Sequence, residues 1–145
     1  MKVWKAALVV VLATIIAVTA YGVLSRGLLS GSSTAGPGNM RSRFPRFNSE
    51  NLARNQELVA RLREIATGKG VTQSQLAVAW VLAKSPSAIP VMGARTRTQL
   101  AESLGALDIA LTQDDIAAIE AAIPADAVAG TRYDAHQMQV LDSER

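Results

Sequence analysis

One uncharged run near the start of the chain limits its possible folds more than any other feature. Residues 6–24 carry no charged side chain over about 19 positions, close to the roughly 20 residues with which a helix crosses a bilayer. Lys2 and Lys5 precede the run, and Val18-Thr19-Ala20 has the small residues of a signal cleavage site. One interpretation is therefore a membrane-inserted helix or a secretory signal.

The composition of the run favours a second interpretation, a buried strand. Val9–Val11 and Ile15–Thr19 are rich in β-branched residues, which suit the buried strands of a parallel sheet. The glycine-containing segment Tyr21–Gly31 follows directly and has the composition of a functional turn. We therefore predict a strand from about Ile15 and keep the membrane segment over residues 6–24 as the alternative.

Helices and one further strand are predicted along the rest of the chain. Residues 31–47 are rich in Gly, Ser, Pro and Arg, which predicts a long mobile loop. Asn48, Thr72 and Thr112 are typical N-cap residues, and the last two open capping-box patterns. The expected elements are helices over about residues 48–67, 72–84, 96–107 and 112–123, and a buried strand over residues 88–92.

This order of elements predicts an α/β fold with parallel strands. The chain has 145 residues, whereas a complete (β/α)8 barrel has about 250, and two strands do not close a barrel. The absence of cysteine excludes disulfides and thiolate metal sites, and the single histidine has no paired ligand, so no metal site is predicted.

The charge pattern does not favour nucleic acid as a partner. The formal net charge is only +3. Arg41, Arg43 and Arg46 are interleaved with Phe44 and Phe47, a pattern that also occurs in single-strand binding proteins. Because this cluster falls in the glycine-rich segment, we interpret it as part of a mobile lid.

Two predicted turns have the chemistry of a phosphate site. The first follows the first strand at residues 21–27 and offers backbone N–H groups, a hydroxyl and the Arg26 guanidinium. The second is Gly93-Ala94-Arg95, a glycine turn at the start of a helix, where unpaired N–H groups favour anions. Arg95 adds a bidentate donor. We expect one phosphate-bearing ligand between the two turns.

Five segments, in the same order along the chain, resemble the aldo-keto reductase family over about residues 15–145. The segments are Ala20–Gly31, Pro45–Leu52, Gln75–Leu82, Gly93–Arg95 with the helix after it, and Gly130–Tyr133 followed by Met138. The resemblance implies the C-terminal part of a (β/α)8 (TIM) barrel, an incomplete barrel of about two strands plus helices. Residues 1–14 look foreign to the family, an apolar segment of uncertain origin, as if the chain began at a displaced start.

The family reduces carbonyls by hydride transfer from NADPH, so the resemblance implies that this chain binds NADP(H). The Tyr21 ring is implied to stack on the nicotinamide, and Arg95 to read the 2′-phosphate. Ser103 stands where the family usually has Asn, and Gly22 and Val23 stand where Ser-Pro is commoner. The implied cofactor-binding residues are Tyr21, Gly22, Val23, Leu24, Ser25, Arg26, Gly93, Arg95, Gln99, Glu102 and Ser103.

The family's catalytic Asp, Tyr, Lys and His come from the first half of the barrel, and no segment of this chain resembles that half. No catalytic residue is therefore assigned. We expect the chain alone to be inactive, of low stability, and to take a small carbonyl substrate only when an N-terminal half completes it. The expected location is the cytoplasm, or a membrane if residues 6–24 insert.

Overall fold

Two short strands pair in parallel in the computed structural model, which describes residues 17–31 and 39–141. Strand β1 (Val18–Tyr21) and strand β2 (Ala88–Val91) are in register from Val18 opposite Ala88 to Tyr21 opposite Val91. The long connection between them contains helices, as a parallel crossover requires. The mixed α/β class predicted from the sequence is confirmed.

The four predicted helices lie where the caps in the sequence placed them, one of them shorter than expected, and a fifth helix, α6, was not predicted. The predicted helix over residues 96–107 ends at Leu104, where the Glu102 carbonyl accepts the Gln75 side-chain N–H at 3.1 Å and the chain tightens into a 3-10 turn. The α-helices are α2 (Ser49–Gly68), α3 (Gln73–Lys84), α4 (Arg97–Leu104), α5 (Gln113–Ala122) and α6 (Ala135–Gln139). The 3-10 helices are η1 (Ser25–Ser30), η2 (Met40–Arg43), η3 (Pro45–Phe47), η4 (Gly105–Asp108) and η5 (Ala125–Ala127).

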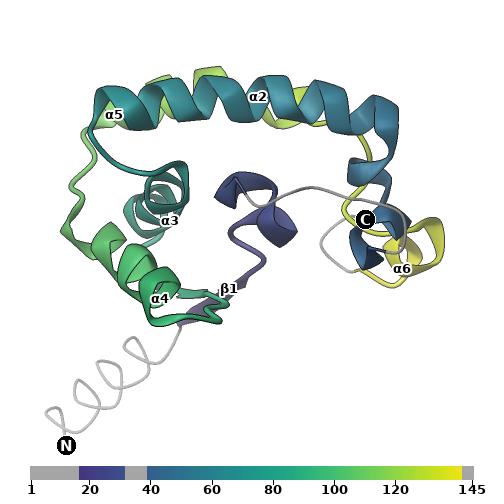
Figure 1. Cartoon of the computed structure of the whole chain (residues 1–145), viewed down its shortest axis with the longest axis horizontal. Helices are drawn as coiled ribbons and strands as arrows, with labels where there is room; N and C mark the ends of the chain where they lie inside the picture. The colour runs from purple at the N-terminus through teal and green to yellow at the C-terminus, as the bar shows by residue number, and fades with distance from the viewer. Residues whose placement is uncertain (1–16, 32–38, 142–145) are drawn as a thin grey trace, which may run out of the picture.

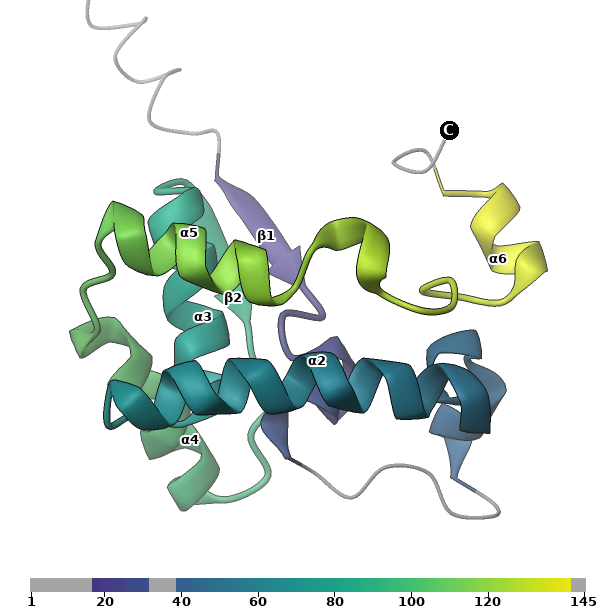
Figure 2. The ribbon, with the colours of Figure 1, turned by 90° about the horizontal axis from the view of Figure 1, so that it is seen from above.

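The longest helix, α2, contacts several of the other elements in the described part of the chain, among them α3, α5, η1 and η3. Helix α5 runs beside it, and α4 and α6 lie toward its opposite ends (Figures 1 and 2). Helix α3 contacts both α2 and strand β2, so it joins the sheet to the helical layer. The segment after β1 packs against α2 and α3, which places the first predicted turn between the sheet and the helices.

The hydrophobic core lies among the helices rather than around the sheet. One buried cluster contains Leu62, Ala66, Leu76 and Ile119, and a second contains Leu28, Phe47 and Val59. Leu29 packs against both clusters, so η1 is anchored in the core by two adjacent leucines. This anchoring fixes the turn that precedes η1.

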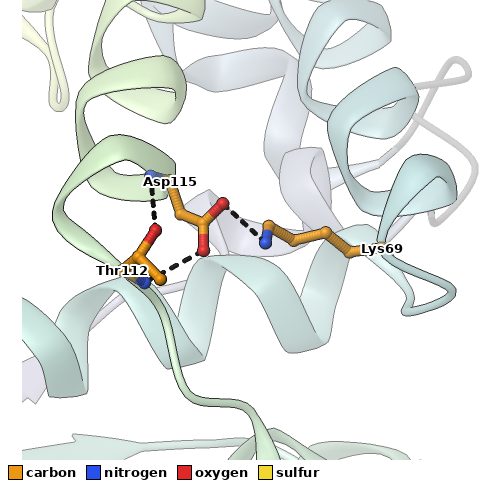
Figure 3. Close-up of polar contacts among 3 residues, drawn as sticks. All are labelled: Lys69, Thr112 and Asp115. Carbon is orange, nitrogen blue, oxygen red and sulfur yellow. Dashed lines mark hydrogen bonds and ion pairs between the residues drawn. The ribbon is translucent and has the colours of Figure 1, made fainter.

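A capping box begins α5, and its Asp115 also forms an ion pair with Lys69 at the end of α2 (Figure 3). The Asp115 backbone N–H donates to the Thr112 hydroxyl at 3.2 Å, and the Asp115 carboxylate accepts the Thr112 N–H at 2.9 Å. The Lys69 ammonium lies 2.6 Å from the same carboxylate. The hydrogen bonds from Lys69 and from the Thr112 backbone lower the pKa of Asp115 to about 2.

One expectation from the sequence is wrong in detail, and another is only partly described. The strands were expected to be buried, but Val18, Ile89 and Val91 are each at least half exposed, because β1 and β2 have only each other as strand neighbours among the described residues. Within the expected mobile loop over residues 31–47, the chain forms the short helices η2 and η3; the Asn39 side chain accepts the Arg41 N–H at 3.1 Å and Pro45 begins η3. The mobility of this loop stays a prediction. Residues 32–38 lie outside the described residues.

The uncharged run is described only in its second part. Val18–Tyr21 form β1, so these residues are a strand, as the second interpretation predicted. Residues 6–16, on which the membrane alternative also depends, lie outside the described residues. Within the described ranges, no helix combines the length and the apolar character needed to cross a membrane.

Candidate functional site

A cleft of about 570 Å³ opens where the two strands end. The turns after β1 and after β2 both line the cleft, because the carboxyl ends of parallel strands meet at one edge of a sheet. Ten of the eleven residues predicted from the sequence line this cleft. They are Tyr21, Gly22, Val23, Leu24, Arg26, Gly93, Arg95, Gln99, Glu102 and Ser103. Their contact with a cofactor stays a prediction.

Ser25, the eleventh residue, lines a second cavity of about 320 Å³. This cavity lies among η1, α2 and the segment after α5, and it shares part of the first turn, Tyr21–Val23 and Arg26, with the cleft. The first turn therefore lies between the cleft and the second cavity and lines both of them. Ser25 is part of this turn but lines only the second cavity.

The first turn has an unusual backbone. Ser25 and Arg26 have φ angles of 47° and 57°, in the left-handed region that residues other than glycine rarely adopt. Hydrogen bonds from Ser25 N–H to the Gly22 carbonyl and from Gly27 N–H to the Leu24 carbonyl, both 2.8 Å, close the turn. Because Leu28 is buried directly after it, packing holds this costly conformation in place.

Tyr21 ends β1 at the mouth of the cleft. Its side chain is 74% exposed, so its ring faces open space rather than the core. An exposed aromatic ring beside a cleft offers a flat apolar surface to a planar ligand.

The second turn uses part of its hydrogen-bonding capacity internally. The Gln99 side chain accepts the Arg95 backbone N–H at 2.8 Å, and Thr96 accepts the Gln99 N–H at 3.2 Å. The Ser103 hydroxyl donates to the Gln99 carbonyl at 3.0 Å. Two of the N–H groups expected to face an anion are thus satisfied within the chain. The Arg95 side chain is exposed, so we expect it, rather than these N–H groups, to meet an anion at this turn.

The cleft is also lined by residues that were not predicted from the sequence, among them the polar side chains of Arg41 and Ser74. Arg41, from η2, brings a third guanidinium to the cleft beside Arg26 and Arg95. Ser74, at the start of α3, is 5% exposed and also lines it. The basic cluster of Arg41, Arg43 and Arg46 was the sequence feature that could have indicated Arg41. The spacing of these arginines does not tell which of them faces the cleft.

Within this cluster, Arg46 has a different role from Arg41. Its Nε donates to the Gly130 carbonyl at 3.2 Å, and it lines the second cavity. Arg41 of this cluster therefore lines the cleft, whereas Arg46 lines the second cavity. Three arginines and one carboxylate, that of Glu102, give the cleft a positive balance that suits a phosphorylated ligand. No group of acidic, histidine or cysteine side chains in the described ranges has the arrangement of a metal site.

The chain is similar in sequence to one family of known proteins. The family model of the aldo/keto reductase family matches residues 8–124. The chain is similar to the aldo-keto reductase yakc [NADP(+)] of Schizosaccharomyces pombe, with 34% identity over 81% of this chain and 36% of the relative. It is also similar to the aldo-keto reductase str7 of Strobilurus tenacellus, with 30% identity over 88% of this chain and 39% of the relative.

A third similar protein, the probable aldo-keto reductase 1 of Glycine max, is 34% identical over 81% of this chain and 35% of its own length. The chain thus spans little more than a third of the length of these curated relatives. The division of the chain at residue 14 stays a prediction.

Proposed function

This chain belongs to the aldo/keto reductase family, and on that premise we propose that its cleft binds NADP(H) as part of a carbonyl-reducing oxidoreductase. The observation that carries the proposal is the convergence of Arg26, Arg41 and Arg95 on one cleft at the carboxyl ends of β1 and β2. This edge of a parallel sheet is where α/β enzymes bind ligands.

The residues present fit a dinucleotide with an additional phosphate. On this proposal Arg95, on the second turn, would bind the 2′-phosphate, and Arg26 and Arg41, which line the same cleft, would bind the pyrophosphate. Tyr21, exposed at the mouth, offers its ring to the nicotinamide. When bound, the cofactor supplies the hydride. The residues of this chain would hold and orient it.

We further propose that the chain works with the other part of a (β/α)8 barrel. Among the described residues β1 and β2 pair only with each other, and the other edge of each strand is a template for additional strands. The apolar side chains at least half exposed on the sheet and around α4 are Val18, Ile89, Val91, Leu100, Leu104 and Leu107. A complementary N-terminal half would cover such surfaces and bring the carbonyl-binding and proton-donating groups that the described residues do not provide.

On this proposal the isolated chain self-associates or melts without cooperativity, because its apolar strand and helix surfaces stay in water. Sedimentation velocity and thermal circular dichroism on the purified chain test this directly. A monomer with a sharp, cooperative melt would count strongly against a missing half. The expected location is the cytoplasm, which fractionation of the expressing cell would test.

The experiment that tests cofactor binding is a fluorescence titration of the purified chain with NADPH and with NADH. Loss of a charge-assisted contact to the 2′-phosphate predicts that Arg95→Ala weakens NADPH binding by about tenfold or more and reduces the preference over NADH. Arg97→Ala is the matched control, because Arg97 is an exposed arginine only two residues further on, at the start of α4, and does not line the cleft.

Saturable NADPH binding that Arg95→Ala weakens and Arg97→Ala leaves within about twofold supports the proposal. Equal loss in both variants indicates a general charge effect. No binding by a folded wild-type chain would refute the proposal.

A further inference from the structure

Arg26 is held between two aromatic rings that come from distant parts of the chain. Its Cζ lies 3.9 Å from the centroid of the Phe44 ring and 5.1 Å from that of the Tyr133 ring. The two rings face each other edge to face, 6.3 Å apart at 73°. Three segments thus meet at one guanidinium: the turn after β1, the chain between η2 and η3, and the segment before α6.

The segment that carries Tyr133 is itself fixed to α2. Asn55, which is 2% exposed, donates to the Ala129 carbonyl and accepts the Ala129 N–H, both at 2.9 Å. Arg46 donates to the Gly130 carbonyl at 3.2 Å. A Cβ at Gly130 would lie 2.9 Å from the Pro45 backbone, so only glycine allows this close approach. Tyr133 therefore follows a tightly docked backbone, and its ring position is set by that docking.

The stack leaves the hydrogen-bonding groups of Arg26 available. In a cation–π contact the ring attracts the charge through its face, whereas the N–H donors of a guanidinium point outward in its plane. Among the described residues, Arg26 makes no hydrogen bond or ion pair with its side chain, although it lines the cleft. The two rings thus restrict a long side chain without using its donors.

We propose that Phe44 and Tyr133 are positioning residues that hold the Arg26 guanidinium at the wall of the cleft for a ligand phosphate. The ligand part of this inference rests on the cofactor binding proposed above. Holding Arg26 in advance lowers the ordering cost of binding. The segment around residues 129–133, which lies outside the cleft, thereby contributes to affinity at the cleft.

The test is a double-mutant cycle on NADPH affinity. Tyr133→Leu removes the ring, and Tyr133→Phe retains it. We expect Tyr133→Leu to weaken NADPH binding by about three- to tenfold, as a partly desolvated cation–π contact predicts, and Tyr133→Phe to stay within about twofold. In the Arg26→Ala background, Tyr133→Leu should have almost no further effect, because its contribution acts through Arg26.

A residue that merely stabilised the fold would weaken binding equally in both backgrounds, and that result would overturn the inference. An unchanged affinity in Tyr133→Leu would also overturn it. Recovery of binding in Tyr133→Phe shows that the ring, and not the hydroxyl, is required.

A second measurement needs no cofactor and separates the two proposals. Trypsin cleaves after exposed arginines, so the rate of cleavage after Arg26, followed by mass spectrometry, reports how firmly this side chain and its turn are held. Tyr133→Leu should accelerate cleavage after Arg26 and leave cleavage after the exposed Arg97 unchanged. Faster cleavage with no NADPH binding by the wild type would support the stack and refute the phosphate contact. Unchanged cleavage would refute the stack itself.

Discussion

The side chain of Asn55 provides the sharpest test of how the segment after α5 is held against α2. Its Nδ2 donates to the Arg46 carbonyl at 3.2 Å and to the Ala129 carbonyl at 2.9 Å, and its Oδ1 accepts the Ala129 N–H. The side chain is 2% exposed, so water cannot replace these partners. Asn55→Asp keeps the shape and the acceptor but replaces the double donor with an oxygen.

The expected cost follows from these contacts. Two lost hydrogen bonds account for about 2 kcal/mol, and leaving two carbonyls opposite a buried carboxylate adds about 1–3 kcal/mol. We therefore expect the segment at Ala129 to open more easily by on the order of 3 kcal/mol, a factor of about 100 in hydrogen-exchange protection. Burial raises the pKa of the introduced carboxyl above its unfolded value. The penalty is thus full above that raised pKa and shrinks as pH falls through it.

Asn48→Asp is the matched control for the same chemical change. Asn48 is exposed and only accepts, from the Asn51 N–H at 3.0 Å, and aspartate serves as well as asparagine at an N-cap. Its effect should stay within about 0.5 kcal/mol. Hydrogen exchange of the Ala129 amide, measured at pH 7 and pH 5 in both variants, is the assay. Equal protection in the two variants would refute the reasoning about Asn55.

Three further perturbations test individual contacts. Gly130→Ala should cost more than about 2 kcal/mol, because φ is +80° and the new Cβ would clash, whereas Gly68→Ala, with open space around it, should stabilise α2 by up to about 1 kcal/mol; urea unfolding of both variants decides. The lowered pKa of Asp115 means that its interaction with Lys69 is fully present above about pH 3.8 and is lost as pH falls toward about 2; Asp115→Asn should remove that part of the acid sensitivity in a circular-dichroism pH titration, and an unchanged profile would contradict it. Thr72→Ala should cost about 1 kcal/mol by removing the cap of α3, measured by urea unfolding.

The local elements followed directly from the sequence. Asn48, Thr72 and Thr112 cap helices at the predicted positions, since a cap depends only on residues three or four positions away. The two turns were found in the same way, because each follows an apolar strand and contains both glycine and arginine. Their approach to one cleft followed from the parallel order of the strands.

Contacts between distant segments could not be obtained in this way. The buried Asn55 interrupts an apolar stripe and reads as a surface residue until Ala129 is placed against it, 74 positions along the chain. The same holds for the contact between the Arg26 guanidinium and the Tyr133 ring, because no pattern in the sequence around either residue indicates it. Arg41 and Arg46 are indistinguishable in sequence, yet only the former lines the cleft.

The sequence by itself determined the four helices from α2 to α5, their caps, the two turns and the parallel strand order, because these depend on periodicity and on neighbours along the chain. Only the tertiary structure decided which side chains are buried and which arginines share a cleft. The exposed strands illustrate the reason. Val18 and Ile89 are residue types that are usually buried, but their burial requires neighbouring strands. Among the described residues, each of the two strands has only the other as a neighbour. The exposure of a side chain depends on which elements pack around it, whereas the propensity of a segment to form a strand depends on its own residues.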